Sequence, residues 1–339
     1  MKNDKKPGFN LNFINTNRSY FFLLLILFCG LFAKNFFSAY NICAVTGNGS
    51  LVIYLGLGFT LCLIAGHMDL TVMYVSTFAS LLCLGLRASS GLPWAVCILL
   101  ATLSGTLVGL VNGILVTKFK IHSFIATLGM QFVVKGAMYI YTGGAELSIG
   151  RDYALNEALN GTVGPLPVSL FFLITTAVTF LLMAVLRYTA FGRNLCMIGG
   201  SLETAWLAGV NSSLVTTMTF IISSTICAFG GALNGIYSGS ASITMGEKGI
   251  SPLMIALTAA IIGGTSIYGG KGSVVWTWVA LVAIAFLKSL CKKTELQVLV
   301  IAAILIVCIF YETLAKYHRD RVVGTRPNLR LEYLNESRK

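Results

Sequence analysis

Charged side chains are scarce in this sequence: Asp, Glu, Lys and Arg make up 11% of its 339 residues, whereas soluble domains carry about a quarter. Hydrophobic residues reach 56%, more apolar surface than a soluble fold of this length could remove from water. Acidic residues are rarest, with 12 against 24 basic ones. The composition indicates one all-α, polytopic integral membrane protein, and it argues against two or three soluble domains.

Motifs for metal binding and catalysis are also missing. The nine cysteines contain no C-x-x-C pair, and the three histidines, His67, His122 and His318, stand apart, so we expect no metal site. No G-x-S-x-G or H-E-x-x-H motif and no paired carboxylates occur in a suitable context. We therefore expect no catalytic residues and no enzyme activity in this chain.

A nucleotide-binding loop is absent too. The nearest segment, Gly264 to Ser273, has Thr265 and Gly272 where a phosphate-binding loop requires Gly and Ser or Thr. We expect it to be a tight turn of small residues instead, and we expect no cofactor on this chain. The net charge of +12 is explained by membrane topology and contact with anionic lipid, so nucleic acid is not an expected partner.

Long apolar runs recur along nearly the whole chain. About 20 helical residues cross a bilayer, and this criterion gives about ten transmembrane helices in a domain spanning residues 20–313, between tails at 1–19 and 314–339. The predicted spans are 20–39, 48–66, 69–86, 92–117, 123–142, 165–186, 214–237, 250–268, 273–290 and 295–313. The first follows a basic tail without a small-residue cleavage site, so we expect an uncleaved helix and not a signal peptide.

Basic residues orient the predicted spans. If the first span starts inside, 16 Lys and Arg residues fall in inner segments and seven in outer ones, with Lys135 inside a span. The positive-inside rule then predicts cytoplasmic termini. The outer trio Lys288, Lys292 and Lys293 violates the rule locally.

Glycine is abundant, at 35 residues, and part of it is spaced for helix packing. Gly105, Gly109 and Gly113 form a double G-x-x-x-G motif, and Gly231 and Gly235 form another. Each presents a face with little side-chain bulk, which indicates a tightly packed bundle.

The segment between the sixth and seventh predicted spans, residues 187–211, is unusually long. Leu202 to Ala208 is predicted to be helical, with Ser201 as N-cap, Glu203 in the first turn and Gly209 at the C-terminal end. A short helix between glycines suits docking onto another protein. From these residues alone, an ordinary connecting loop is the favoured interpretation.

Four ordered sequence blocks carry a resemblance to a known family. They are Leu55 to Leu70, Gly109 to Met130, Phe191 to Gly200 (F-G-R-N-L-C-M-I-G-G) and Ala259 to Ser273 (A-A-I-I-G-G-T-S-I-Y-G-G-K-G-S). Here the chain resembles the permease subunits of bacterial ATP-binding-cassette importers for ribose, xylose, arabinose, galactose and related sugars. It departs from the family at His67, Thr71, Ser123 and Ser201, where the usual pattern has Gly, Ser, Pro and Asn, which leaves substrate identity open.

The resemblance implies a location in the bacterial cytoplasmic membrane and a set of partners. These are cytoplasmic ATPase subunits that hold ATP and magnesium, a soluble solute-binding protein on the outer surface, and a second permease subunit in a homodimer or heterodimer. It also implies that residues 191–211 form the coupling loop that sits on the ATPase. Its candidate residues are Phe191, Gly192, Arg193, Gly199, Gly200, Glu203, Ala205 and Gly209.

Polar residues at membrane depth are candidates for a translocation path or gate, because they are costly in lipid. Asp69 is expected to be the N-cap of the third span, with a gating contact as the alternative. Asn112 and Asn234 suit interhelical hydrogen bonds more than substrate contact. Lys135, with Gln131 one turn earlier, either snorkels or pairs with a carboxylate, or lines a wet path.

Two other functions compete with a sugar importer. A secondary transporter driven by an ion gradient would favour buried carboxylates and inverted repeats, but membrane-depth acids are few and no convincing repeat is visible. The second alternative is an importer of the same architecture for a non-sugar solute, such as a nucleoside or a branched-chain amino acid.

Overall fold

The computed structural model describes residues 23–310 except 25, 28, 29, 32, 149–152, 164, 165, 245–250, 292, 294, 308 and 309. Its helices, in chain order, are α2 (Ala39–Ile64), α3 (Val72–Ser90), α4 (Trp94–Thr117), α5 (Ser123–Thr142), α6 (Ala154–Asn160), α7 (Leu170–Tyr188), α8 (Ala190–Gly200), α9 (Leu202–Leu207), α10 (Ser212–Ser238), α11 (Pro252–Ile262) and α12 (Val274–Leu290), followed by Glu295–Val307. The predicted all-α fold is confirmed. Both predicted tails lie outside the described residues.

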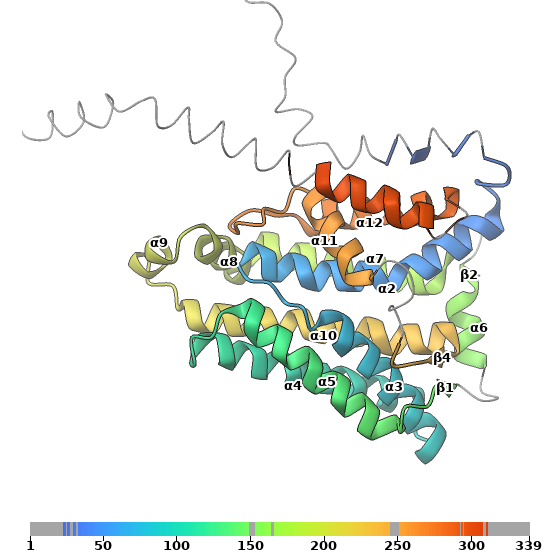
Figure 1. The fold of residues 1–339 in the computed structure, drawn as a ribbon, viewed down its shortest axis with the longest axis horizontal. Coiled ribbons are helices and arrows are strands. Elements are labelled where there is room, and N and C mark those ends of the chain that lie inside the picture. Colours follow the sequence, from blue (N-terminus) through green and yellow to red (C-terminus); the bar gives the residue numbers. More distant parts are fainter. Residues whose placement is uncertain are drawn as a thin grey trace, which may run out of the picture.

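The axes of the long helices are roughly aligned with one another, so the bundle has two ends (Figure 1). One end carries α8 and α9 and is called the α8–α9 end. The opposite end, the α6 end, carries α6 and four short strands that pair antiparallel. β1 (Leu147–Ser148) pairs with β4 (Ser240–Ala241), and β2 (Thr162–Val163) pairs with β3 (Leu166–Ser169).

Six described helices are long and apolar enough to cross a bilayer: α2, α3, α4, α5, α7 and α10. Three shorter apolar helices, α11, α12 and Glu295–Val307, stand where the last three spans were predicted. Of the first predicted span, residues 20–22, 25, 28, 29 and 32 lie outside the described residues, and residues 33–37 form a bend and turns before α2, so the span does not continue as a helix to residue 39. The chain is therefore an integral membrane protein, and the expected count of about ten helices is compatible with the described part.

Two predicted span boundaries are wrong. Ser38 begins α2 nine residues before the predicted start, because its hydroxyl accepts the backbone N–H of Asn41. α11 ends at Ile262, where Gly264 adopts a φ of +86°, so the predicted span 250–268 contains a helix of 11 residues. At 1.5 Å per residue it is about 16 Å long, roughly half the hydrocarbon core.

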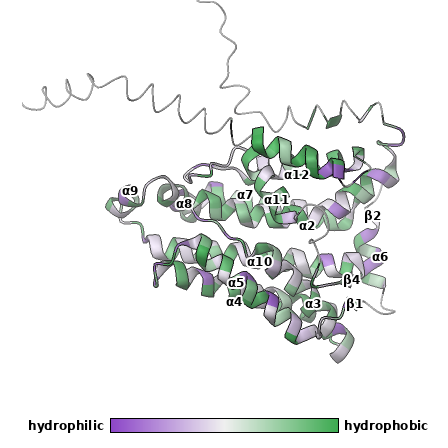
Figure 2. Cartoon of the chain, in the orientation of Figure 1, coloured by the Kyte–Doolittle hydropathy of each residue, from purple (hydrophilic) through white to green (hydrophobic). Residues whose placement is uncertain are grey.

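The helices divide into an interior and a rim. α2, α3 and α10 are buried along most of their lengths, whereas only a minority of the residues of α4, α5 and α7 are buried. The exposed faces of α4 and α5 carry large apolar residues such as Leu103, Leu107, Ile125 and Phe132. Figure 2 shows hydrophobic colour along the outer helices and hydrophilic colour mainly near the two ends. Lipid is the solvent that suits this distribution.

Glycine sets the distance between α10 and its neighbours, as the G-x-x-x-G motifs predict. Gly109 of α4 packs against the backbone of α10, and a methyl group there would lie 2.5 Å from the carbonyl oxygen of Phe220. Gly231 of α10 packs against the backbone of Ser76 in α3. Ser80 strengthens the second contact by donating a hydrogen bond to the carbonyl oxygen of Gly231 at 2.5 Å.

This packing gives a matched prediction. Gly109→Ala should destabilise the purified protein by about 1–3 kcal/mol, because neither backbone can yield to the added methyl group. Gly129→Ala is the control, since Gly129 in α5 has no atom within 4 Å of the added carbon, and it should be neutral or slightly stabilising. Thermal denaturation in detergent measures both. Equal losses at the two positions would contradict the packing role of Gly109.

Candidate functional site

The predicted coupling loop, residues 191–211, folds as two short helices at the α8–α9 end. The prediction for α9 is confirmed: Ser201 accepts the backbone N–H of Thr204, Glu203 lies in the first turn, and Gly209 follows the helix with a φ of +74°. The helix α8 was not predicted. Its signal is the spacing of Gly192, Leu195 and Ile198, the three residues that α8 buries.

A glycine junction, defined by Gly66, Gly199, Gly269 and Gly270, holds this pair of helices against the bundle. A methyl group at Gly199 would overlap the carbonyl oxygen of Ile64 and lie 2.6 Å from the nitrogen of Gly270. The N–H of Gly270 donates to the same Ile64 carbonyl at 2.9 Å. The end of α2, the end of α8 and the turn between α11 and α12 therefore meet backbone to backbone.

The turn between α11 and α12 can enter this junction because of its glycines. Gly264, Gly269 and Gly270 all have positive φ values, which side-chain-bearing residues rarely adopt. The N–H of Ser266 donates to the carbonyl oxygen of Lys271 at 2.9 Å, which closes the turn. The prediction of a tight turn of small residues is confirmed, whereas its contact with the α8 segment was not foreseen.

The candidate residues of the coupling loop divide by exposure. Ala205 and Gly192 are buried against the bundle, and Phe191 and Gly199 are half-buried. Arg193, Gly200, Glu203 and Gly209 are exposed. The buried members fix the two helices in place, and the exposed members are available to a partner.

Sequence reasoning did not single out the apolar side chains of α9. Leu202, Trp206 and Leu207 are 61%, 74% and 73% exposed and together form what we call the α9 patch. These side chains lie on a loop element at the end of the bundle, next to exposed polar residues. An exposed apolar patch with a polar rim is typical of a surface that binds another protein.

Asp69 and Asn112, two predicted path residues, are joined through Thr71. The N–H of Thr71 donates to Asp69 Oδ1 at 2.9 Å, and the Thr71 hydroxyl donates to the same oxygen. Asn112 Nδ2 donates to Thr71 Oγ1 at 3.0 Å. The structural role expected for Asn112, a hydrogen bond between helices, therefore corresponds to its bond with Thr71, directly before α3.

The expected role of Asp69 as the N-cap of the third span is wrong. Thr71 is the N-cap of α3, and it makes no side-chain capping bond. Asp69 lies two residues earlier, in the connection between α2 and α3, and is fully buried. Burial raises the pKa of its carboxyl group to about 6, although the hydrogen bonds from Thr71 lower it. Asp69 Oδ2, Asn112 Oδ1 and Ser223 Oγ have no hydrogen-bond partner among the described residues.

The remaining predicted path residues lie on α5 and α10. Gln131 and Lys135 are half-buried on α5, and Lys135 interacts with neighbouring groups. Asn234 is buried in α10, where it also has an interaction. Thr217 of α10 packs against Gly113, the residue after Asn112 in α4, and so marks the level of Asn112 in the bundle. Asn234 lies about 25 Å farther along α10. Asn234 therefore lies apart from the hydrogen-bonded group of Asp69, Thr71 and Asn112.

Comparison with known proteins gives a family match over most of the chain. The model of a family described as "Branched-chain amino acid transport system / permease component" matches residues 41–309. The ribose import permease protein RbsC of Haemophilus influenzae is 28% identical, over 85% of this chain and 89% of its own. The xylose/arabinose import permease protein XylH of Sulfolobus acidocaldarius is 30% identical, over 81% of this chain and 78% of its own.

A third relative has a similar level of identity. The fructose import permease protein FrcC of Rhizobium meliloti is 30% identical, over 74% of this chain and 71% of its own. No solved structure matches the chain.

The glycine junction makes a prediction at two adjacent residues. Gly199→Ala should separate α8 from the end of α2, because the methyl group overlaps a backbone oxygen that is held by a hydrogen bond. We expect a destabilisation of about 1–3 kcal/mol and faster proteolysis of residues 191–211. Gly200→Ala is the control, since nothing lies within 4 Å of its added carbon. Limited proteolysis and thermal denaturation distinguish the variants, and indistinguishable behaviour would exclude the junction as a rigid contact.

Proposed function

The chain belongs to the family of branched-chain amino acid transport system / permease components, and from that premise we propose that it is the membrane subunit of an ATP-powered monosaccharide importer. The family resemblance predicted from the four sequence blocks is confirmed. Because the family consists of permease components, the chain is a transport subunit and not an enzyme.

Sugars are the proposed substrate class. The three relatives described above are named for the import of ribose, of xylose and arabinose, and of fructose. The family description refers to branched-chain amino acids, and other relatives are named for autoinducer 2. A monosaccharide is therefore the substrate that the names support best, and an amino acid or a nucleoside is the alternative within the same architecture.

The glycine junction together with the α9 patch is the observation that carries the energy-coupling part of the proposal. The patch offers Leu202, Trp206 and Leu207 to a partner, and we assign it to a cytoplasmic ATP-binding-cassette subunit that holds ATP and magnesium. A displacement of α8 and α9 would be passed on through Gly199 to the end of α2 and to the turn before α12. Backbone contacts suit this role, because they have no side-chain rotamers to absorb the movement.

Orientation follows from this assignment. The α8–α9 end would face the cytoplasm, with both chain termini on that side of a bacterial inner membrane. The basic residues Lys118, Lys120, Arg187, Arg193 and Lys271 belong to connections at this end, in agreement with the positive-inside rule. The α6 end, with exposed Glu146 and Glu157, would receive the soluble binding protein. A second permease subunit, identical or homologous, would complete the path.

A solute panel tests the proposed substrate class. The chain, its ATPase and its binding protein are reconstituted in liposomes with ATP inside, and uptake of labelled ribose, xylose, fructose, leucine and adenosine is compared. We expect uptake of a sugar that requires ATP and persists with an uncoupler. Uptake of leucine or adenosine alone would show that the substrate is an amino acid or a nucleoside and not a sugar. Loss of uptake on addition of the uncoupler at constant ATP would indicate a secondary transporter.

The α9 patch generates a prediction about binding to the ATPase subunit. Trp206→Ala should weaken binding to the ATPase subunit about tenfold or more, since buried Trp side chains are typical interface hot spots. Tyr153→Ala is the control for ATPase binding, because Tyr153 is also exposed and aromatic but precedes α6, at the opposite end of the bundle. Co-purification with the ATPase and ATP-dependent uptake are measured at equal membrane levels. If Trp206→Ala retains full coupling, the patch is not the ATPase contact.

A further inference from the structure

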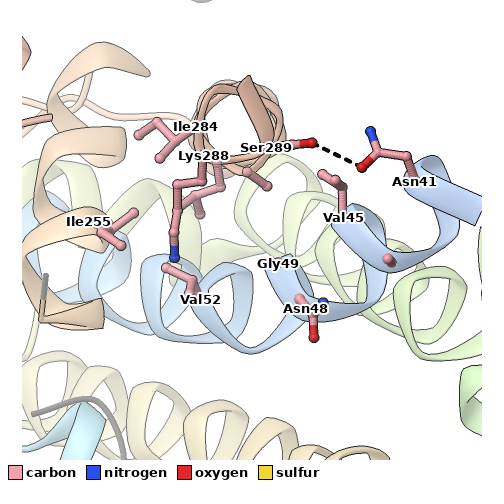
Figure 3. Close-up of a pocket in the computed structure, with 12 residues that line it drawn as sticks. Asn41, Val45, Asn48, Gly49, Val52, Ile255, Ile284, Lys288 and Ser289 are labelled. Atoms are coloured by element: carbon pink, nitrogen blue, oxygen red, sulfur yellow. Dashed lines mark hydrogen bonds between the residues drawn. The ribbon is translucent and has the colours of Figure 1, made fainter. Parts of the chain in front are cut away.

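A cavity of about 360 Å³ lies between the first half of α2, the helix α11 and the last turns of α12 (Figure 3). Its volume falls in the range of about 300–1,000 Å³ that small-molecule sites occupy. The polar lining residues are Asn41, Asn48, Lys288 and Ser289, and the other lining residues are small or apolar. Such a cavity can hold a molecule that has one polar end and a less polar body.

Lys288 is the only charged residue among the described residues of the lining. A lysine in the last turn of a helix often stabilises the carbonyl end of that helix. In α12 a different residue has this role, because Gln297 Nε2 donates to the carbonyl oxygens of Lys288 and Cys291 at 3.0 and 2.6 Å. Figure 3 shows the Lys288 side chain running from α12 toward α2, so its ammonium group points into the cavity.

The polar groups beside Lys288 are already paired with each other. Ser289 Oγ donates to Asn41 Oδ1 at 3.0 Å, and Asn41 Nδ2 donates to the carbonyl oxygen of Phe36 at 2.7 Å. The first bond joins α2 to α12, the second holds Asn41 to the segment before α2, and together they fix one rim of the cavity. Gly49 brings the two helices close, since a methyl group there would lie 3.0 Å from Cβ of Ala285. The described residues of this rim therefore carry no negative charge.

The Lys288 side chain is exposed, and the protein around it desolvates only part of it. No charged group among the described residues acts on it. A partly desolvated ammonium group without a counter-charge is unfavourable, and an anion brought from outside the chain would relieve the cost. The exposed amide of Asn48 lies on the same lining and adds hydrogen-bonding capacity. Val45, Val52, Ile255 and Ile284 provide an apolar wall for a carbon skeleton.

We propose that this cavity binds an anionic group, a carboxylate or a phosphate, with Lys288 as its cationic contact. The group belongs either to a small acidic solute, such as a sugar acid, or to the headgroup of an anionic phospholipid whose chain follows the apolar wall. The inference does not depend on the proposed function, because binding to the purified chain is measured without transport.

Thermal denaturation of the purified full-length chain tests the proposal. In detergent, the shift produced by glucuronate is compared with that produced by glucose. In nanodiscs, phosphatidylglycerol is compared with phosphatidylcholine. Lys288→Gln should raise the anion concentration that gives half of the maximal thermal shift by about tenfold or more, the loss of affinity expected for a charge-assisted contact. Lys288→Arg should retain it, and Lys293→Gln is the control because Lys293 is exposed and does not line the cavity.

Each outcome has a defined meaning. Stabilisation by glucuronate but not glucose, lost only in Lys288→Gln, supports the site with a solute as its ligand. Stabilisation by phosphatidylglycerol with the same dependence supports it with a lipid headgroup. If neither anion stabilises the protein, or if Lys288→Gln responds like the unmodified chain, the proposal is overturned. Uptake of neutral sugars in the reconstituted system remains a separate measurement, so the two proposals can fail independently.

Discussion

Close approach of one backbone to another, at positions where glycine leaves room, is the constraint on which this structure depends. It joins α4 to α10 at Gly109, α10 to α3 at Gly231, and the end of α8 to the end of α2 at Gly199. In lipid the hydrophobic effect does not press helices together, so van der Waals contact and hydrogen bonds between them must do so. Small residues are the means by which both become available at short range.

The same constraint relates the two halves of the proposed mechanism. The α9 patch is a contact surface of three exposed apolar side chains, and by itself it explains only binding. Gly199 adds a mechanical connection, because its backbone packs directly against the backbones of Ile64 and Gly270. No compliant side chain lies between these three backbones. In the proposed mechanism, force applied to α8 and α9 would therefore reach α2, a buried central helix, and the segment that leads into α12.

Much of the fold was accessible from sequence because it depends on local patterns. Apolar runs located the long helices, G-x-x-x-G spacing identified the faces of α4 and α10, and Ser201 with Gly209 delimited α9. The glycine junction was not accessible, since it joins Gly66, Gly199 and Gly269, which are separated by scores of residues and whose contact depends on how the helices pack.

Errors in the sequence interpretation have equally physical causes. An apolar run does not reveal where a glycine with positive φ ends a helix, which is why α11 is shorter than predicted. Asp69 was expected to cap a helix because Asp often does so, but Thr71 occupies that position and Asp69 holds Thr71 instead. Of the candidate site, α9 was predicted and α8 was missed, although its apolar spacing was present. The α9 patch was missed because exposure is a property of the folded chain.

The chain of hydrogen bonds from Asp69 through Thr71 to Asn112 also defines which parts of the bundle belong together. It ties the start of α3 to α4, and both helices pack on α10 through glycine. The helices α11 and α12 instead pack mainly with α2. The bundle thus consists of two blocks that share α2 and α10 as their boundary. A bilayer that thickens, thins or bends around the protein would tend to slide these blocks past each other, which makes lipid composition an input to their relative position.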